Sequence, residues 1–480
     1  MMNAVLKKKK SYIHTVVMFL LMIIISFLPP FGAITPLGMK VLGVFIGIIY
    51  GWCFIDLMWP SLIGFFVIGL TGYMTVTQAL TAAFANATTL SIIFCFAFAE
   101  CVRRIGVADA IAYWTLSRKI FVGRPWTLIM GLMLSAFILT ILGGGEAVVF
   151  IFWAIIDSIV KVNNIDRKNP IVSITCLLVL FIGLAGKLAV PFQPAALIYI
   201  GFYENAMSGP IPFLQFLLAA IICYLITFAV MLFVSKYILK TDAASFVLTE
   251  EIRAEYAKCK MNITQKVGLI LLVVYFVGLL MASSLKSPFW SMLNTWGVIG
   301  FSIIYMVIFA IWQNDQGEPM CSINDAMRHG VMWSVILLFG VTIPLSAAVE
   351  SADVGIMATV NHFCLQIFDG WSLTLLLIVM VIFIGALTQF FHNVVMGALF
   401  IPVLGPIVVS LGGNPLVFFF MIYMALQCAY GTPAASLMAG LGFGKEGMLN
   451  KYAYLYGWMF FACQALILIM GIPLWNLLFR

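Results

Sequence analysis

The chain has 480 residues, of which 64% are hydrophobic and only 9% are charged, with a net charge of +7. A soluble domain carries about 25% charged residues to cover its surface, so the composition excludes an ordinary soluble protein. Hydrophobic runs of about 20 residues recur along the chain, and this is the length of a helix that crosses a bilayer. Because alternating strand-like segments of about ten residues are missing, we expect an all-α polytopic membrane protein rather than a transmembrane barrel.

The first apolar run, Tyr12 to Leu28, follows four lysines, Lys7 to Lys10. No small-residue cleavage site follows this run, so we expect an uncleaved first helix with a cytoplasmic N-terminus. About eleven membrane-spanning helices are predicted along the chain. In order, these spans are 11–29, 36–54, 58–73, 88–106, 169–202, 211–236, 266–284, 296–312, 330–350, 414–442 and 453–478.

Two further apolar stretches, 125–160 and 371–410, are too long for one helix and carry a polar or glycine-rich break near their middle. The breaks lie at 143–146 and 391–393. Such a break is tolerated inside a membrane only where the backbone lines a cavity or is covered by protein. We therefore predict two re-entrant helical hairpins, each of which enters and leaves the membrane on the same side.

The distribution of Lys and Arg supports this topology, because cytoplasmic segments of membrane proteins are enriched in these residues. With both hairpins re-entrant, 21 of the 25 Lys and Arg residues fall on the predicted cytoplasmic side. These are Lys7 to Lys10, Arg103, Arg104, Arg118, Lys119, Arg124, Lys161, Arg167, Lys168, Lys236, Lys240, Arg253, Lys258, Lys260, Lys266, Arg328, Lys445 and Lys451. A single helix in place of either hairpin would destroy this segregation.

The second half of the chain repeats the spacing of the first. Gly106 and Gly143 are 37 positions apart, and so are Gly355 and His392. After each hairpin a Pro-Ala-Ala sequence follows, at Pro194 and at Pro433. The two copies begin on opposite sides of the predicted membrane, so they form an inverted-topology repeat. Transporters with such repeats bind substrate near the midplane of the membrane, where broken helices meet.

A substrate site is therefore predicted at four broken points in the helices, where free N–H groups and positive helix-dipole ends suit an anion. Close helix packing is the alternative explanation for the glycines in and around these points, Gly183 and Gly186 included. The candidate substrate-binding residues are Gly143, Gly144, Gly145, Lys187, Gln193, Pro194, His392, Asn393, Val394, Thr432 and Pro433.

Glu146 and Lys187 are the charged residues that we expect deepest in the membrane, where a charge is costly and a functional role is the default. The alternative is that they form a buried structural pair. His392 is a candidate for anion binding or proton transfer, or else for a packed, hydrogen-bonded histidine. Glu146 and His392 are thus the candidate proton carriers, whereas Glu100 and Glu350 lie at helix ends and are interpreted as structural.

The sequence resembles the divalent anion:sodium symporter (DASS) family of dicarboxylate, citrate and sulfate carriers over about residues 83–475. The matching motifs are Gly385–Val394, Ile401-Pro402, Leu411–Leu416 and Gly431–Pro433. The resemblance implies a homodimer in which a transport domain moves like an elevator against a fixed scaffold. It also implies that a Ser-Asn-Thr motif at each hairpin tip, with a Thr-Pro loop in each broken helix, holds sodium ions and substrate carboxylates.

This sequence departs from those family motifs. The tips read Gly-Gly-Gly at 143–145 and His-Asn-Val at 392–394, and Gln193-Pro194 stands in the first Thr-Pro loop. Most hydroxyl groups that the resemblance assigns to sodium binding are thus missing. A sodium site near Asn393 and Gly431 is kept as an alternative. Fixed positive groups at Lys187 and His392 instead favour anion exchange or proton coupling, because they cannot leave the empty site.

The sequence therefore predicts a secondary transporter of small organic anions, most simply dicarboxylates, in a bacterial-type inner membrane. A sodium-coupled symporter is the alternative within transport, and a channel or a non-transporting membrane protein is the alternative outside it. No cofactor, nucleic-acid partner or enzymatic activity is expected. The predicted units are scaffold helices at 1–124 and 237–370, and transport-domain repeats at 125–236 and 371–480.

Overall fold

The computed structural model describes residues 2–480 except 143–146, 208, 315–316, 369 and 434. The described residues form helices and connecting loops, with two isolated β-bridges and no sheet. This architecture confirms the all-α prediction. The first half contains α1 (Met2–Phe27), α2 (Pro36–Phe54), α3 (Met58–Thr71), α4 (Val76–Phe84), α5 (Ala87–Ile105), α6 (Val107–Leu116), α7 (Pro125–Ile141), α8 (Ala147–Val162), α9 (Pro170–Ala189), α10 (Pro194–Met207), α11 (Phe213–Phe233) and α12 (Glu250–Lys258).

The second half follows the same order of long helices, turns and breaks. Its helices are α13 (Ile263–Ser284), α14 (Pro288–Ile311), α15 (Ile323–Gly330), α16 (Trp333–Glu350), α17 (Ile356–Ile367), α18 (Leu373–Leu387), α19 (Asn393–Ser410), α20 (Pro415–Leu426), α21 (Leu437–Gly444), α22 (Asn450–Met470) and α23 (Ile472–Leu478). Gly106 and Gly355 occupy equivalent turns, and both have the positive φ, +74° and +71°, that glycine adopts without strain.

Among the described residues, eight helices are long and apolar enough to cross a membrane, or nine if the bent pair α4–α5 is counted as one span. Seven of the eight coincide with predicted spans. The eighth is α19, the second arm of the predicted hairpin at 371–410. The bent pair accounts for one more predicted span. The remaining three predicted spans match shorter apolar helices, α1, α3 and α20.

Burial divides the helices into central and peripheral ones. In α9, 94% of the most apolar window is buried, whereas in α13 only 28% is buried. The exposed faces of peripheral helices carry large apolar side chains, such as Leu70 at 67% exposure and Ile270 at 62%. Exposure of this much apolar surface to water would oppose folding, whereas lipid accommodates it. The protein is therefore a multi-pass membrane protein whose central helices are enclosed by protein.

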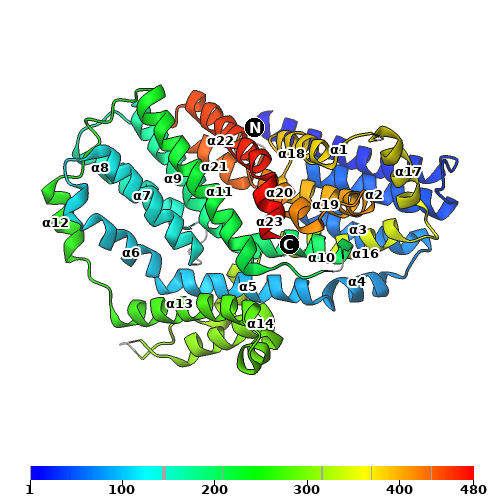
Figure 1. Cartoon of the computed structure of the whole chain (residues 1–480), viewed down its shortest axis with the longest axis horizontal. Coiled ribbons are helices and arrows are strands. Elements are labelled where there is room, and N and C mark those ends of the chain that lie inside the picture. The colour runs from blue at the N-terminus through cyan, green and yellow to red at the C-terminus, as the bar shows by residue number, and fades with distance from the viewer. Residues whose placement is uncertain (1, 143–146, 208, 315–316, 369, 434) are drawn as a thin grey trace.

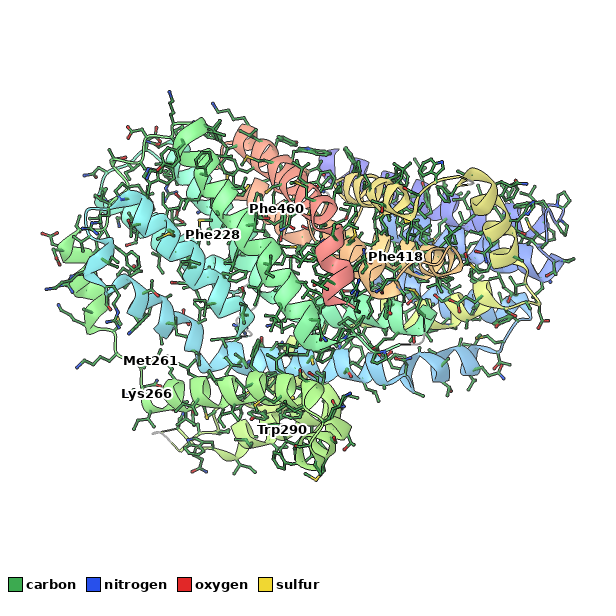
Figure 2. All side chains as sticks on the ribbon, viewed as in Figure 1. Phe228, Met261, Lys266, Trp290, Phe418 and Phe460 are labelled. Atoms are coloured by element: carbon green, nitrogen blue, oxygen red, sulfur yellow. The ribbon has the colours of Figure 1, made fainter. Side chains whose placement is uncertain are left out.

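The helices pack in two sets. We call α1–α5 and α13–α16 the framework group, because these helices mainly contact one another. We call α7–α11 and α18–α22 the site group, in which α9, α11, α20 and α22 pack together. Figure 1 shows α5 running along one edge of the molecule with α13 beside it. Figure 2 shows Phe228 on α11 and Phe460 on the neighbouring α22, whereas Met261 and Lys266 lie at the rim.

Gly183 and Gly186 lie inside α9 rather than in its break. A methyl group on Gly186 would overlap the carbonyl of Phe137 and the hydroxyl of Thr140, both on α7. A methyl on Gly183 would lie 3.0 Å from the Cβ of Ala136. The close-packing alternative for these two glycines is therefore confirmed, because they allow the first hairpin arm to approach the central helix.

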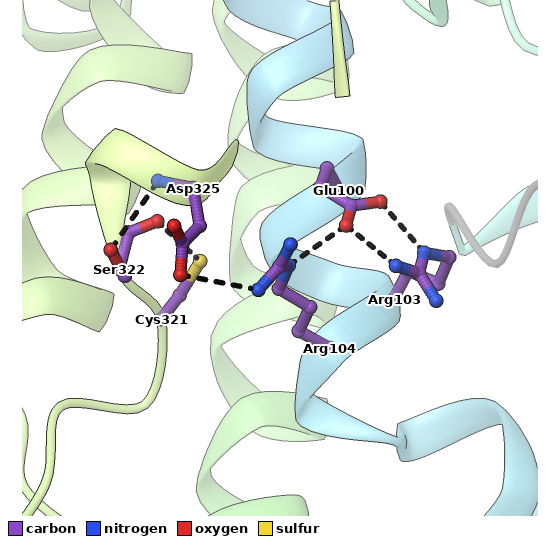
Figure 3. Close-up of polar contacts among 6 residues, drawn as sticks. All are labelled: Glu100, Arg103, Arg104, Cys321, Ser322 and Asp325. Atoms are coloured by element: carbon purple, nitrogen blue, oxygen red, sulfur yellow. Dashed lines mark hydrogen bonds and ion pairs between the residues drawn. The ribbon is translucent and has the colours of Figure 1, made fainter. Parts of the chain in front are cut away.

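Glu100 lies near the end of α5 that is predicted to face the cytoplasm, and its side chain is 9% exposed. It accepts hydrogen bonds from Arg103 at 2.6 Å and from Arg104 at 2.8 Å, and Arg104 lies 3.5 Å from Asp325 on α15 (Figure 3). This network joins the end of α5 to the helix that precedes α16. The contacts agree with the structural role predicted for Glu100.

Replacing Glu100 with Gln removes the carboxylate that accepts from Arg103 and Arg104, and leaves Arg104 with Asp325 alone. We expect the free energy of unfolding to fall by roughly 1–3 kcal/mol, the usual contribution of a hydrogen bond to a charged group. The readout is the apparent Tm in detergent. Glu250→Gln is the matched control, since Glu250 pairs with Arg253 at a site where it is 60% exposed, and there we expect less than about 0.5 kcal/mol. Equal effects of the two substitutions would contradict this assignment.

Candidate functional site

A cavity of about 670 Å³ lies where the two helix groups meet. It is bounded by the break between α9 and α10, the tip before α19, the break between α20 and α21, and the start of α16. Seven of the predicted site residues line it: Lys187, Gln193, Pro194, His392, Asn393, Val394 and Pro433. Residues from both sequence repeats therefore surround one space. Gly143, Gly144, Gly145 and Glu146 lie outside the described residues.

Three helices begin at this cavity. The first residues of α10, Pro194 and Ala195, line it, and the beginnings of α19 and α21 do so as well. A helix N-terminus carries a partial positive charge and N–H groups without partners in the helix. Three such ends favour an anion at this cavity, while the C-terminal ends of α9 and α20, which also border it, offset part of that effect.

The second hairpin tip is ordered by its own side chains. The backbone N–H of Val394 donates to Asn393 Oδ1 at 3.0 Å and to His392 Nδ1 at 3.3 Å. Asn393 Nδ2 donates to Gln427 Oε1 at 3.4 Å across to the second broken helix. His392 and Asn393 thus cap α19 while their remaining polar atoms border the cavity.

Lys187 lies in the last turn of α9, half-buried, and lines the cavity. It is placed where its ammonium group adds to the field of the helix N-termini. Most of the other lining residues are apolar, among them Leu57, Phe96, Leu184 and Val335. A small number of polar groups on an apolar wall is typical of a site for a small molecule.

The first hairpin is joined to the first broken helix by Gln193. Its side-chain amide donates to the carbonyls of Thr140 and Ile141, both at 2.9 Å. These carbonyls belong to the last turn of α7, where a helix has no internal donors left for them. The Thr140 hydroxyl in turn donates to the carbonyl of Gly183 on α9. We call this set the first clamp.

The second hairpin is joined to the second broken helix by Gln389. Its amide nitrogen donates to the carbonyls of Gly385 at 2.8 Å and Cys428 at 3.0 Å, and its oxygen accepts the N–H of Gly431 at 2.7 Å. The Thr432 hydroxyl donates to the backbone carbonyl of Gln389. We call this set the second clamp. Thr432, predicted as a substrate ligand, therefore faces Gln389 and does not line the cavity.

The two clamps use the same residue types in exchanged positions. Thr140 and Gln389 stand three residues before the equivalent tip positions, Gly143 and His392. In the breaks, Gln193 directly precedes Pro194, and Thr432 directly precedes Pro433. In the first repeat the hairpin supplies Thr and the break supplies Gln. In the second repeat this order is reversed. In both, the break side chain donates to the backbone carbonyl of the hairpin residue.

Sequence reasoning missed Tyr199, Gln427 and Ser334, which also line the cavity. Tyr199 follows Pro194 by five positions and lies in the second turn of α10. Gln427 follows the last residue of α20. Their position in or beside broken helices was the available signal. Among the described residues, no group of three or more His, Cys, Asp or Glu is arranged to hold a metal ion.

The chain matches the family described as the sodium:sulfate symporter transmembrane region over residues 9–480. It is 24% identical over 362 residues to the sodium-dependent dicarboxylate transporter SdcS of Staphylococcus saprophyticus, a match that covers 70% of this chain and 69% of that protein. It is 28% identical over 147 residues to an uncharacterized transporter of Haemophilus influenzae, covering 30% and 31% of the two chains.

Two solved structures share this fold. One is the YdaH transporter of Alcanivorax borkumensis, with a TM-score of 0.58, 11% identity, and coverage of 83% of this chain and 88% of that one. The other is MtrF of Neisseria gonorrhoeae, with a TM-score of 0.57, 12% identity, and coverage of 82% and 83%. At these identities the likeness concerns the arrangement of helices.

Replacing Gln389 with Leu keeps the approximate side-chain volume but removes the second clamp's amide. We expect the free energy of unfolding to fall by about 2–4 kcal/mol, because the N–H of Gly431 and the carbonyl of Cys428 lose their partner in a buried place. The readout is the apparent Tm in detergent. Gln464→Leu is the control, because Gln464 is fully buried and its side-chain polar atoms have no partner among the described residues. A Gln389→Leu protein as stable as Gln464→Leu would contradict the clamp.

Proposed function

The chain belongs to the sodium:sulfate symporter family, a family of membrane transporters and not of enzymes, and on that premise we propose that it carries small dicarboxylates across the membrane. The observation that carries this proposal is the cavity between the two repeats, where three helix N-termini, Lys187 and the His392–Asn393 tip surround one space. The name of the Staphylococcus saprophyticus relative supports a dicarboxylate as the substrate.

The charge balance of the cavity supports a dianion. Lys187 supplies one positive charge and the helix ends supply partial ones, and His392 supplies a second full charge when it is protonated. In the proposed binding mode these groups neutralise the substrate, with Gln193, Pro194, Val394 and Pro433 shaping the wall around it. The Gly143–Gly145 tip completes the proposed binding set.

The proposed coupling is anion exchange or proton coupling. Fixed positive groups cannot leave with the substrate, so the empty cavity would return through the membrane without the anion that these groups bind in the loaded state, which is costly. A returning anion removes that cost, as does a proton movement on Glu146 or His392. The clamps support this choice, because amide N–H groups of Gln193 and Gln389 already occupy helix-end carbonyls that could otherwise face a cation.

Sodium-coupled symport is the second candidate function. The match to a relative that is named as sodium-dependent favours it. In this alternative a sodium ion is bound near Asn393 and Gly431, where backbone carbonyls and the Asn393 side chain supply oxygen ligands. The two candidates make opposite predictions for the driving force of uptake.

The proposed mechanism is of the elevator type, with the site group as the moving part and the framework group as the fixed part. The sequence units 125–236 and 371–480 correspond to the moving part. Polar contacts cross between the groups on the side away from the cavity mouth. Asn86 Nδ2, at the start of α5, donates to Asn205 Oδ1 on α10 at 3.1 Å, and Thr88 Oγ1 donates to Glu204 Oε2 at 3.4 Å. An elevator movement must break these contacts.

The proposed orientation places the cavity mouth in the cytoplasm. Met332 and Leu437, which are 44% and 62% exposed, border the mouth, and basic residues stand close by in sequence, Arg328 in α15, Lys445 between α21 and α22, and Lys451 at the start of α22. The positive-inside rule then assigns this side to the cytoplasm, together with the N-terminus. An inner-membrane location and a homodimer, both expected from the sequence and its family resemblance, belong to the same proposal.

The coupling proposal predicts how proteoliposomes take up labelled succinate. We expect internal succinate to accelerate uptake at least about tenfold, and an inward sodium gradient to have little effect, because a returning anion neutralises the fixed charges. Lys187→Ala should lower uptake at least about tenfold, since one full charge is lost from the cavity. Uptake that requires a sodium gradient and ignores internal succinate would exclude the exchange proposal and support the symporter.

The elevator proposal predicts the effect of joining the two groups. In the variant with Asn86→Cys and Asn205→Cys, a short bifunctional thiol reagent should lower succinate transport at least about tenfold, with recovery after reduction, because domain movement is blocked. The control joins helices within the site group, by Thr227→Cys beside the native Cys463, whose sulfur lies 3.9 Å from the Thr227 hydroxyl. Full transport by the cross-linked Asn86–Asn205 variant would exclude relative movement of the groups.

A further inference from the structure

Two neighbouring polar side chains in the wall of the cavity have donor groups with no described partner outside the pair. Tyr199 on α10 is 2% exposed and Gln427, at the end of α20, is 4% exposed, and both line the cavity. The Tyr199 hydroxyl lies beside the Gln427 side chain. Apart from their contact with each other, neither the Tyr199 hydroxyl nor Gln427 Nε2 has a hydrogen-bond partner among the described residues. Such groups are costly in a protein interior unless something else satisfies them.

The surrounding packing holds the Tyr199 ring in place. The ring packs edge-on to Tyr423, with the ring centroids 5.4 Å apart, and edge-on to Phe202 at 6.1 Å. On α19, Gly397 leaves room for it, because a Cβ at that position would lie 2.6 Å from the Tyr199 ring. A ring fixed on three sides keeps its hydroxyl in one place, which is a requirement for a specific binding contact.

Gln427 is held by the second hairpin tip. Its Oε1 accepts from Asn393 Nδ2 at 3.4 Å. Because the oxygen of Gln427 accepts a hydrogen bond from Asn393, the N–H groups are the part of this side chain that can donate to a ligand in the cavity. The tip of the second hairpin and the end of α20 thus orient this amide together.

Comparison of the two repeats shows that Tyr199 and Gln427 have apolar counterparts. Tyr199 and Gln427 have the sequence equivalents Met438 and Leu188, each 239 positions away, as Pro194 is from Pro433. Met438 and Leu188 also line the cavity. The sequence positions of Tyr199 and Gln427 therefore carry neutral hydrogen-bond donors, whereas their equivalents in the other repeat carry apolar side chains. Helix packing alone does not require this difference, because the apolar pair fills the equivalent positions.

We propose that Tyr199 and Gln427 form a neutral donor subsite that binds one carboxylate of a dicarboxylate and selects against monocarboxylates. The inference rests on the proposed function and adds the residues that determine its specificity. Neutral N–H and O–H donors recognise a carboxylate without adding fixed charge to the empty carrier. A substrate with only one carboxylate leaves these donors unsatisfied, and such a loss gives strong discrimination.

The test compares binding of succinate with binding of butyrate, which has the same carbon chain and one carboxylate fewer. Binding is measured by titration calorimetry on the purified full-length protein and its Tyr199→Phe and Gln427→Met variants. We expect each substitution to weaken succinate binding about tenfold, the effect of losing one buried hydrogen bond. Butyrate binding should change less than about threefold, since butyrate does not use the subsite.

The stability of the empty protein separates binding from a structural role. Tyr199→Phe removes a buried hydroxyl whose one neighbouring polar group among the described residues is Gln427, so the apparent Tm without ligand should change little. Tyr224→Phe and Gln464→Met are matched controls, because Tyr224 and Gln464 are also buried with unpartnered polar atoms but do not line the cavity. Both controls should keep the wild-type ratio of succinate to butyrate affinity.

The outcomes separate this inference from the function it rests on. An unchanged affinity ratio in both Tyr199→Phe and Gln427→Met, with normal succinate binding, overturns the subsite and leaves the dicarboxylate carrier intact. A wild-type protein that binds neither succinate nor fumarate overturns both. A lower ratio in the variants but not in the controls supports the subsite.

Discussion

Backbone groups that a helix leaves unpaired inside a membrane must find a partner within the protein, and this constraint governs the centre of the molecule. The chain breaks its helices at α7–α8, α9–α10, α18–α19 and α20–α21. Among the described residues, the breaks at α9–α10, α18–α19 and α20–α21 free carbonyls and N–H groups beside the cavity. The side chains of Gln193 and Gln389 engage several such groups directly, so the unwound segments remain tolerable in a low-dielectric environment.

The two clamps show how an internal repeat preserves a physical function without preserving residues. A side-chain amide has both donors and an acceptor, whereas a hydroxyl is smaller and reaches nearer groups. The repeats exchange these two side chains between hairpin and break, yet both end with the hairpin tied to its broken helix. The constraint therefore acts on the pair and not on either position alone.

The same breaks generate the electrostatics of the cavity. A helix that restarts inside the membrane presents a positive end there, and the starts of α10, α19 and α21 share one space. Packing then decides what surrounds that space. Gly183 and Gly186 admit α7 close to α9, and Gly397 admits the ring of Tyr199. Small residues at helix contacts thus position the polar groups that line the cavity.

The sequence by itself determined the membrane helices, both hairpins, the repeat and seven of the residues that line the cavity, because apolar length and the spacing of breaks are local properties of the chain. It also identified four polar residues as candidates for the site, because polar residues within apolar stretches stand out in a sequence. These are Lys187, Gln193, His392 and Asn393. Only the tertiary structure decided that Thr432 faces Gln389, and that Tyr199 and Gln427 meet at the cavity wall. Those outcomes depend on the rotation and contact of helices that are distant in sequence, and an apolar helix in the protein centre carries no periodic pattern that reveals which face its few polar side chains occupy.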